Sequence, residues 1–479
     1  MKRPDRPAPQ HWTALVFQML PFADAASADL PLPQLLRLAL FQVSVGMAMV
    51  LLNGTLNRVM VVELGTPTWL VALLIAVPLL AAPFRALIGH KSDTHRSVLG
   101  WRRVPYIWFG TLMQFGGLAI MPFALLLLDQ AEDFNIGLLG ATAAFLLTGV
   151  GFHVTQTAGL ALATDLAPED KRPRAVALLY VMLLVGMMFS AFVIGGLLVD
   201  YSPTRLVQVI QGAAVLTIVL NVIALWKQEA RDTAATAPDR ETPLFSDLWQ
   251  AFVRDGRNAR LLTGIGIGAM GFAMQDALLE PYGGEILGLS VGTTTGLTGA
   301  WALGSLIGFM LSGRLLGQGW DQLRLAGAGL VIGINAFLLV LFAGPFSAPV
   351  MLYCGALGIG LGLGLFSVGT LMEAMSIAKS ETAGLALGAW GAVQATCAGV
   401  GIAIGGLLRD LIAALVGSSD AAASTATRAS GYATVYTLEV ALLLAGLAAL
   451  GPLVGQKRNH APDGDAPQAQ PFGLREFPT

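Results

Sequence analysis

The sequence contains little charge. Only 12% of its 479 residues are Asp, Glu, Lys or Arg, 55% are hydrophobic, and the mean hydropathy is +0.68. An ordinary soluble domain has about 25% charged residues, and a soluble chain of this length would need polar surfaces for two or three domains. The shortage excludes a soluble enzyme, a disordered chain and a collagen-like fibre, and it indicates an integral membrane protein.

Cysteine and net positive charge are also scarce. Cys354 and Cys397 both lie in apolar runs. Two thiols make neither a disulfide framework nor a four-ligand zinc site, so we predict that both are packing residues. The chain has 28 Lys and Arg against 30 Asp and Glu. It therefore lacks the basic excess of a nucleic-acid-binding protein, and no nucleic-acid partner is expected.

Long apolar runs are abundant. A helix of about 20 residues crosses the roughly 30 Å of hydrocarbon in a bilayer. The runs are continuously apolar, whereas a membrane β-barrel shows short alternating segments. We predict an all-α integral membrane protein with twelve transmembrane helices, at 38–62, 68–89, 105–128, 136–164, 174–199, 205–226, 261–282, 293–317, 324–344, 347–375, 384–408 and 432–455.

The distribution of Lys and Arg predicts the orientation. With the N-terminus inside, 24 of the 28 fall on cytoplasmic segments, and only Arg58, Arg205, Arg409 and Arg428 fall outside. This positive-inside bias predicts that both termini are cytoplasmic and that the chain is a multi-pass protein of the inner membrane.

Composition shifts divide the chain into five parts. Residues 1–37 form an N-terminal arm, in which the spacing of Trp12, Leu15, Val16 and Met19 predicts a short interfacial helix; a disordered Pro-rich arm is the alternative. Two six-helix halves are expected at 38–226 and 261–455. The linker 227–260 is cytoplasmic and is predicted to carry an amphipathic helix after the N-cap Ser246. The tail 456–479 is predicted to be disordered.

The two halves share short sequences. Ile194–Asp200 and Ile404–Asp410 both read Ile-Gly-Gly-Leu-Leu-x-Asp, where x is any residue, at an offset of 210. A weaker match joins Gly46–Met49 to Gly271–Met274. The matches predict a duplicated six-helix unit. Parallel six-helix repeats, related by an axis along the membrane normal, are the architecture of the major facilitator superfamily.

Two glycine motifs do not indicate an enzyme. Gly266–Gly271 fits GxGxxG but lies inside an apolar run without a βαβ unit, and Gly288–Gly292 fits GxSxG but lies in a loop between helices. We therefore expect no catalytic residues and no directly bound metal.

Ionisable groups at membrane depth are candidate functional residues, because a charge there costs several kcal/mol. The set consists of Arg58, Glu63, His153, Asp276, Glu280, Glu373 and Glu439. Three of these, Arg58, Glu63 and Glu280, lie near outer ends and could simply reach the interface. Glu373 lies toward the inner end, where it could pair with an Arg.

His153 is the candidate of most interest. It lies near the middle of its run, and neutral imidazole can ligate the central magnesium of a chlorin. Gln156 lies three residues later on nearly the same face. We predict that these two residues bind pigment; a histidine hydrogen-bonded to a neighbouring helix is the alternative.

A charged loop follows the second span. Gly89, Asp93, Gly100, Arg102 and Arg103 resemble the signature loop of the major facilitator superfamily, although the distance from Asp93 to Gly100 is too long. We expect a cytoplasmic charge network of Asp93, Arg102, Arg103, Asp165 and Arg174. Ordinary positive-inside charges are the equally weighted alternative.

A narrower resemblance covers residues 20 to about 199. The segments that carry it are Leu20–Ser27, Gly54–Met60, Ala82–Leu87, Ser92–His95, Arg102–Trp108 and Gln114–Gly117. Together they resemble the bacteriochlorophyll-delivery (PucC/LhaA) branch of the major facilitator superfamily, and overall similarity favours the LhaA type.

The resemblance implies a role in assembling the light-harvesting antenna around the reaction centre. Its expected cargo is bacteriochlorophyll, with carotenoid or lipid as further candidates. Its expected partners are the antenna α and β polypeptides, the reaction centre, pigment-synthesis or insertion machinery, and membrane lipids. Its expected location is the intracytoplasmic photosynthetic membrane of a phototrophic bacterium. A proton-coupled transporter of a small amphiphile, using Asp276, Glu373 or Glu439, is the alternative, and a scaffold that only binds antenna subunits is a third hypothesis.

Overall fold

The computed structural model describes residues 30–80, 101, 103–128, 134–168, 171–229, 256–377, 383–417 and 425–454. Within these ranges the regular structure is entirely helical. The helices of the first half are α2 (Leu32–Leu38), α3 (Leu40–Met49), η2 (Val50–Leu56), η3 (Val59–Glu63), α4 (Thr68–Leu80), α6 (Val104–Leu128), α7 (Phe134–Leu166), α8 (Arg172–Leu197) and α9 (Pro203–Leu225). Those of the second half are α11 (Gly256–Ala273), η5 (Met274–Ala277), α12 (Leu279–Glu285), α13 (Val291–Gly317), α14 (Gln322–Ala343), α15 (Pro349–Ile377), α16 (Ala383–Gly417), α17 (Thr425–Leu450) and η6 (Gly451–Leu453).

Eleven helices in the described part of the chain are long and apolar enough to span a membrane. The remaining predicted span begins with α4, of which the 13 residues from Thr68 to Leu80 are described. Large apolar side chains such as Phe109, Phe123 and Phe189 are exposed on the outside of the bundle. This is the surface that a lipid environment requires, and the chain is a multi-pass membrane protein.

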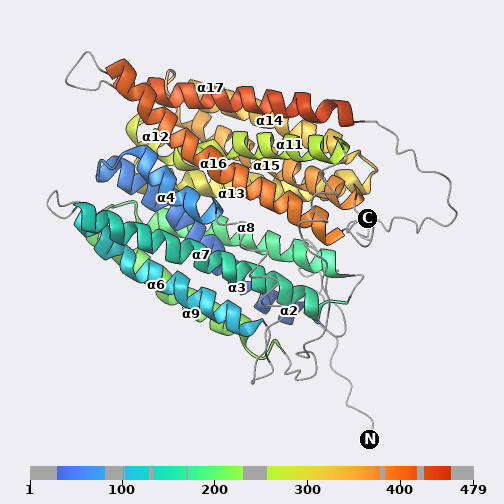
Figure 1. Ribbon diagram of the computed structural model, residues 1–479. Helices are drawn as coiled ribbons and strands as arrows, with labels where there is room; N and C mark the ends of the chain where they lie inside the picture. Colours follow the sequence, from blue (N-terminus) through green and yellow to red (C-terminus); the bar gives the residue numbers. More distant parts are fainter. Residues whose placement is uncertain are drawn as a thin grey trace, which may run out of the picture.

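The helices form two groups that lie side by side (Figure 1). In the first group α3 packs against α8 and α9, and α6 packs against α7 and α9; in the second, α11 packs against α16 and α17, and α14 packs against α15 and α17. The pairs α8–α13 and α4–α16 join the groups. We call the contact between the two groups the seam. Each pair takes one helix from each half, so the seam has the pseudo-two-fold pattern that a duplicated unit produces.

The repeated Gly-Gly pairs lie at this seam. A Cβ on Gly195 of α8 would stand 2.8 Å from the carbonyl oxygen of Gly292, and a Cβ on Gly406 of α16 would stand 3.0 Å from that of Thr68. Only glycine allows the backbones to approach so closely. The contacts are not made by equivalent positions, because the offset of 210 pairs Gly195 with Gly405, which faces Met274 of its own half. The weaker repeat is not equivalent either, since Gly46 faces α8 whereas Gly271 faces Leu443 of α17.

Two spans are irregular where straight helices were expected. The first span turns from α3 into π-helical η2 and η3, and the seventh is interrupted by the 3-10 segment η5 between α11 and α12. Such segments inside a helix often mark functional positions. We use "outer end" for the end of the bundle that contains residues 63–68 and 286–291, and "inner end" for the opposite one, following the predicted orientation.

The structure corrects two expectations. We predicted that the eleventh span ends at Leu408, but α16 continues to Gly417 because Arg409 and Asp410 have partners inside the protein. Cys354 was predicted to be a packing residue, but it is exposed, whereas Cys397 is partly buried beside Gly266. The predicted helices of the N-terminal arm and of the linker, the tail after residue 455, and Asp93 and Arg102 lie outside the described residues.

Candidate functional site

His153 and Gln156 are both buried in the middle of α7. Their exposed fractions are 6% and 7%, and the His153 ring lies 4.5 Å from that of Phe152, centroid to centroid. The Gln156 amide donates to the side-chain oxygen of Gln42 on α3 at 3.4 Å. The predicted pigment residues are therefore neighbours on one helix and are enclosed by protein. A chlorin could reach His153 only if the surrounding side chains moved.

A network of neutral polar residues lies nearby in the first half. The Gln114 amide donates to the carbonyl of Ser44 at 2.9 Å, Ser44 donates to Asn221 at 2.9 Å, and Asn221 donates to Thr111 at 2.8 Å. The four side chains are fully buried and join α3, α6 and α9. The sequence analysis considered ionisable groups and so missed them; the available signal was the presence of Gln114 and Asn221 in two apolar runs.

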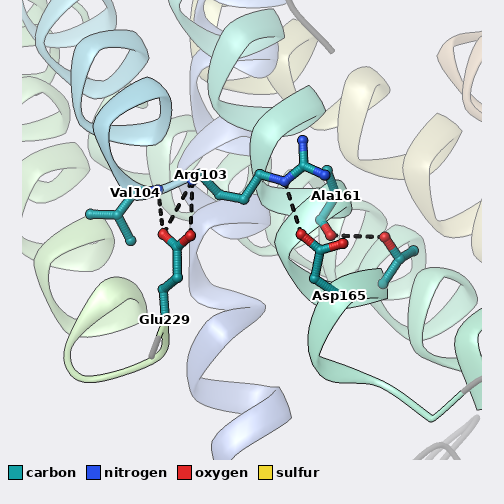
Figure 2. Close-up of polar contacts among 6 residues, drawn as sticks. Arg103, Val104, Ala161, Asp165 and Glu229 are labelled. Carbon is teal, nitrogen blue, oxygen red and sulfur yellow. Dashed lines mark hydrogen bonds and ion pairs between the residues drawn. The ribbon is translucent and has the colours of Figure 1, made fainter. Parts of the chain in front are cut away.

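Charged residues meet at the inner end of the first half (Figure 2). The guanidinium Nε of Arg103 donates to Asp165 on α7 at 2.9 Å. Glu229, just after α9, accepts from the backbone N–H of Arg103 and, at 2.9 Å, from that of Val104. The structure thus brings together two residues of the expected network and adds Glu229. Arg174 lies at the start of α8 and is partly buried.

Arg58 and Glu280 lie at the outer end of the seam. Arg58 forms an ion pair with Glu63 and donates to the carbonyl of Leu289, across the seam, at 3.1 Å. Glu280 is buried and accepts from Thr298. These groups were expected to reach the interface, and Glu63 is partly exposed, but Arg58 and Glu280 are buried within the protein.

Arg409 organises a second outer-end cluster. It forms ion pairs with Glu285 of α12 and with Asp410, and its guanidinium lies 4.7 Å from the centre of the Tyr432 ring. Asp410 also accepts from the backbone N–H of Trp69, the second residue of α4, at 2.8 Å. This contact ties α16 to α4 across the seam. Arg409 was counted as a loop charge in the sequence, and no local pattern linked it to Glu285.

The three remaining carboxyl groups have different environments. Glu373 of α15 pairs with Arg257 of α11 at 2.9 Å, which accounts for its charge. Asp276 lies in η5 and accepts from its neighbour Gln275. Glu439 of α17 is completely buried. In the described part of the chain, no group of three metal-ligating side chains comes together.

Comparison with known proteins identifies the family of the chain. Residues 55–458 match the family described as "PUCC protein". The chain belongs to the PucC family. It is 55% identical to Protein PucC of Rhodovulum sulfidophilum over 403 residues, which cover 82% of this chain and 89% of that one.

Two other relatives of this PucC-family chain come from Rhodobacter capsulatus. It is 52% identical, over 97% of its length and 98% of the other, to an uncharacterized protein in the puhA-bchM intergenic region of Rhodobacter capsulatus. It is 28% identical, over 79% and 88%, to the bacteriochlorophyll synthase 44.5 kDa chain of Rhodobacter capsulatus.

Solved structures show the fold. A mutant of the nucleoside transporter NupG matches with a TM-score of 0.66 at 13% identity, over 88% of this chain and 100% of that one. A bacterial homologue of the lysosomal transporter Spinster, inward-facing and unoccupied, matches with a TM-score of 0.64 at 15% identity, over 87% and 95%. The PucC-family chain therefore has the major facilitator fold that the repeats predicted.

Proposed function

We propose that the protein is an assembly factor for the bacterial light-harvesting antenna that binds bacteriochlorophyll and delivers it to the antenna polypeptides within the membrane. The observation that carries the proposal is membership of the PucC family, with more than half of 403 aligned residues identical to a PucC protein. The more distant relative named as a bacteriochlorophyll synthase chain supports the choice of pigment. The core antenna around the reaction centre is the complex that we propose is served.

The surface of the bundle suits a hydrophobic cargo. Phe109 and Phe123 on α6 and Phe189 on α8 are each more than 60% exposed. A pigment with a long apolar tail partitions into lipid and would approach along such a surface rather than through an aqueous channel. Antenna α and β polypeptides, as membrane helices, would meet the same face.

Within this proposal His153 supplies the axial ligand to the pigment's magnesium, and Gln156 assists it. Imidazole nitrogen is a common metal ligand, and its position in mid-membrane matches that of a lipid-soluble cargo. Because both side chains are buried, binding requires α7 to separate locally from α3.

The test is an absorption spectrum with pigment extraction, on protein purified in mild detergent from a phototroph that expresses it. Stoichiometric bacteriochlorophyll is expected, with loss on His153→Leu and retention in the control Thr157→Val, one turn further along α7. Pigment that remains bound to the His153→Leu variant would show that a residue other than His153 ligates the magnesium. Absence of both pigment and antenna subunits from the wild-type preparation would refute delivery.

A proton-coupled transporter of a small amphiphile is the second candidate function. The observation in its favour is the similarity to transporters in fold, together with the buried carboxyl groups Glu280 and Glu439. Its test is uptake into liposomes that contain the purified protein. Uptake of an amphiphilic solute that follows an imposed pH gradient would favour this candidate, and its absence would favour delivery.

A further inference from the structure

Glu439 is a carboxyl group without an evident structural task. Its exposed fraction is 0%, and no described side chain donates a hydrogen bond to either carboxyl oxygen. It lies near the middle of α17, inside a membrane span. An unpaired carboxylate there has a desolvation cost of several kcal/mol, so the site needs a cation to balance its charge.

The interrupted seventh span faces this residue. η5 packs against α17, and the backbone of Gln275 and the carboxyl group of Asp276 are the groups of η5 that act on Glu439. Asp276 is partly buried and is held by the Gln275 amide. Interrupted membrane helices commonly form ion and proton sites, because their free backbone groups and nearby acids face one another.

A pocket of about 400 Å³ lies at the outer end between α12, α14 and α17. Tyr436 lines it, is completely buried as a residue, and has a hydroxyl group without a hydrogen-bond partner in the described structure. Tyr436 and Glu439 are three residues apart and therefore lie on one face of α17. Tyr436 is thus the lining residue of the pocket that shares a helix face with Glu439.

The other titratable and charged groups around Glu439 belong mostly to the outer-end clusters. From α17 itself they are Arg428, Tyr432 and Tyr436; from η5, Asp276; from α12, Glu280, Tyr282 and Glu285; and from α16, Cys397, Arg409 and Asp410. Arg257 and Arg260 of α11 and Arg324 of α14 lie near the inner ends of their helices. Arg409 is engaged by Glu285 and Asp410, so no described cation is paired with Glu439.

We propose that Glu439 is a proton-binding site, supplied from the outer pocket through Tyr436 and facing Asp276 at the interruption of the seventh span. A proton moves from water in the pocket to a carboxylate oxygen of Glu439, and no other bond changes. A proton fits better than a metal ion, because the described residues bring no third acid, His or Cys to the site. The inference does not depend on pigment delivery.

The site is connected to the contact between the halves. The Asn57 amide of the first span donates to the carbonyl of Asp276 at 3.4 Å, across the seam. The π-helical η2 ends at Leu56, the residue before Asn57, and η5 packs against η2. Loss of the proton would place a negative charge beside Asp276 and would therefore act on this contact.

The first experiment uses the intact wild-type protein in proteoliposomes and the membrane-soluble reagent dicyclohexylcarbodiimide, which adds to protonated carboxyl groups in apolar surroundings. Mass spectrometry should find the adduct on Glu439 and not on Glu373 or Glu285, whose carboxylates are paired with arginines. An adduct on either paired residue with none on Glu439 would overturn the proposal. This comparison needs no variant and so does not depend on one that folds.

The second experiment is infrared spectroscopy of the same preparation in H₂O and D₂O. A carbonyl band of a protonated carboxyl group should be present in the wild type and absent from Glu439→Gln. Its deuterium shift should appear severalfold more slowly in Tyr436→Phe. The matched control is Tyr353→Phe, which loses a hydroxyl bonded to Thr293 away from the pocket. A band that persists in Glu439→Gln would refute the site, and equal exchange in both tyrosine variants would refute the route.

Discussion

At the scale of single residues, Arg409 shows how a full positive charge is accommodated in a membrane-spanning helix. Its side chain is 10% exposed, and that of Glu285 is 9% exposed. The pair is completed by Asp410 and by the face of Tyr432. A buried pair of this kind is costly to break, because removing one partner leaves the other charge uncompensated.

Arg409→Leu should therefore lower the free energy of unfolding by about 3–5 kcal/mol, because Glu285 is left buried without its partner. The measurement is denaturant unfolding of the purified protein in mixed micelles. The double variant Arg409→Leu/Glu285→Leu should recover most of the loss. A double variant as unstable as the single one would show that Arg409 acts through other contacts.

At the scale of helices, Glu229 closes the first turn of α6 from outside that helix. Its carboxylate accepts from the backbone N–H groups of Arg103 and Val104 (Figure 2). The first N–H groups of a helix have no partner within it, and a carboxylate there also favours the helix dipole. α6 contains no acidic residue in its first turn that could serve instead.

Glu229→Ala should lower the free energy of unfolding by about 0.5–2 kcal/mol, as the loss of other N-terminal caps does. Glu229→Gln keeps the acceptor oxygen and should lose less than the alanine variant. Thermal unfolding in detergent compares the two. Equal losses for Ala and Gln would mean that the charge matters rather than the hydrogen bonds.

The adjacent glycines of α8 give a sharper comparison at the same scale. A Cβ on Gly195 would press on Gly292 of α13, whereas a Cβ on Gly196 would meet nothing within 4 Å. Gly195→Ala should cost about 1–3 kcal/mol by overpacking, and Gly196→Ala should be neutral or slightly stabilising. Thermal unfolding of the two variants checks this; equal effects would show that the seam adjusts without cost.

At the scale of the whole molecule, the described side-chain bonds between the halves gather at the outer end. Thr55 of the first span and Thr295 of α13 share a hydrogen bond of 3.1 Å, and both are completely buried. The other described bonds of this kind join Asn57 to Asp276, Arg58 to Leu289 and Asp410 to Trp69. The described polar contacts therefore hold the halves together toward the outer end.

A cysteine pair at Thr55 and Thr295, in a chain whose native cysteines are replaced by alanine, should cross-link readily with a membrane-permeant oxidant. The hydroxyl separation of 3.1 Å places the two positions in direct contact. The shift in gel mobility after proteolysis within the linker reports the bond. A single Thr55→Cys variant is the control, and failure to cross-link would mean that the outer end opens in the membrane.

The sequence was sufficient to predict the architecture, but it was insufficient to predict the ion-pair partners of the buried charged residues. Apolar run lengths predicted the helices, and the repeated Ile-Gly-Gly-Leu-Leu predicted the duplicated fold, because both depend on local composition. An arginine partner was predicted for Glu373, but not which arginine, and the partner of Arg409 was not predicted, since Arg257 and Glu285 lie more than a hundred residues away. The interruption at η5 did have a local signal that we did not use: Pro281 cannot donate to the carbonyl of Ala277, the last residue of η5. The predicted roles of His153 and Gln156 stay predictions.

The position of Glu229 also sets the length of the tether between the halves. Because this residue is fixed to α6, the connection runs only from 230 to 255 before α11 begins at Gly256. In the described part of the chain the halves meet along the seam, where glycine backbones touch and a few polar side chains cross. A displacement of one half is therefore transmitted to the other through backbone contacts that leave no room for a side chain.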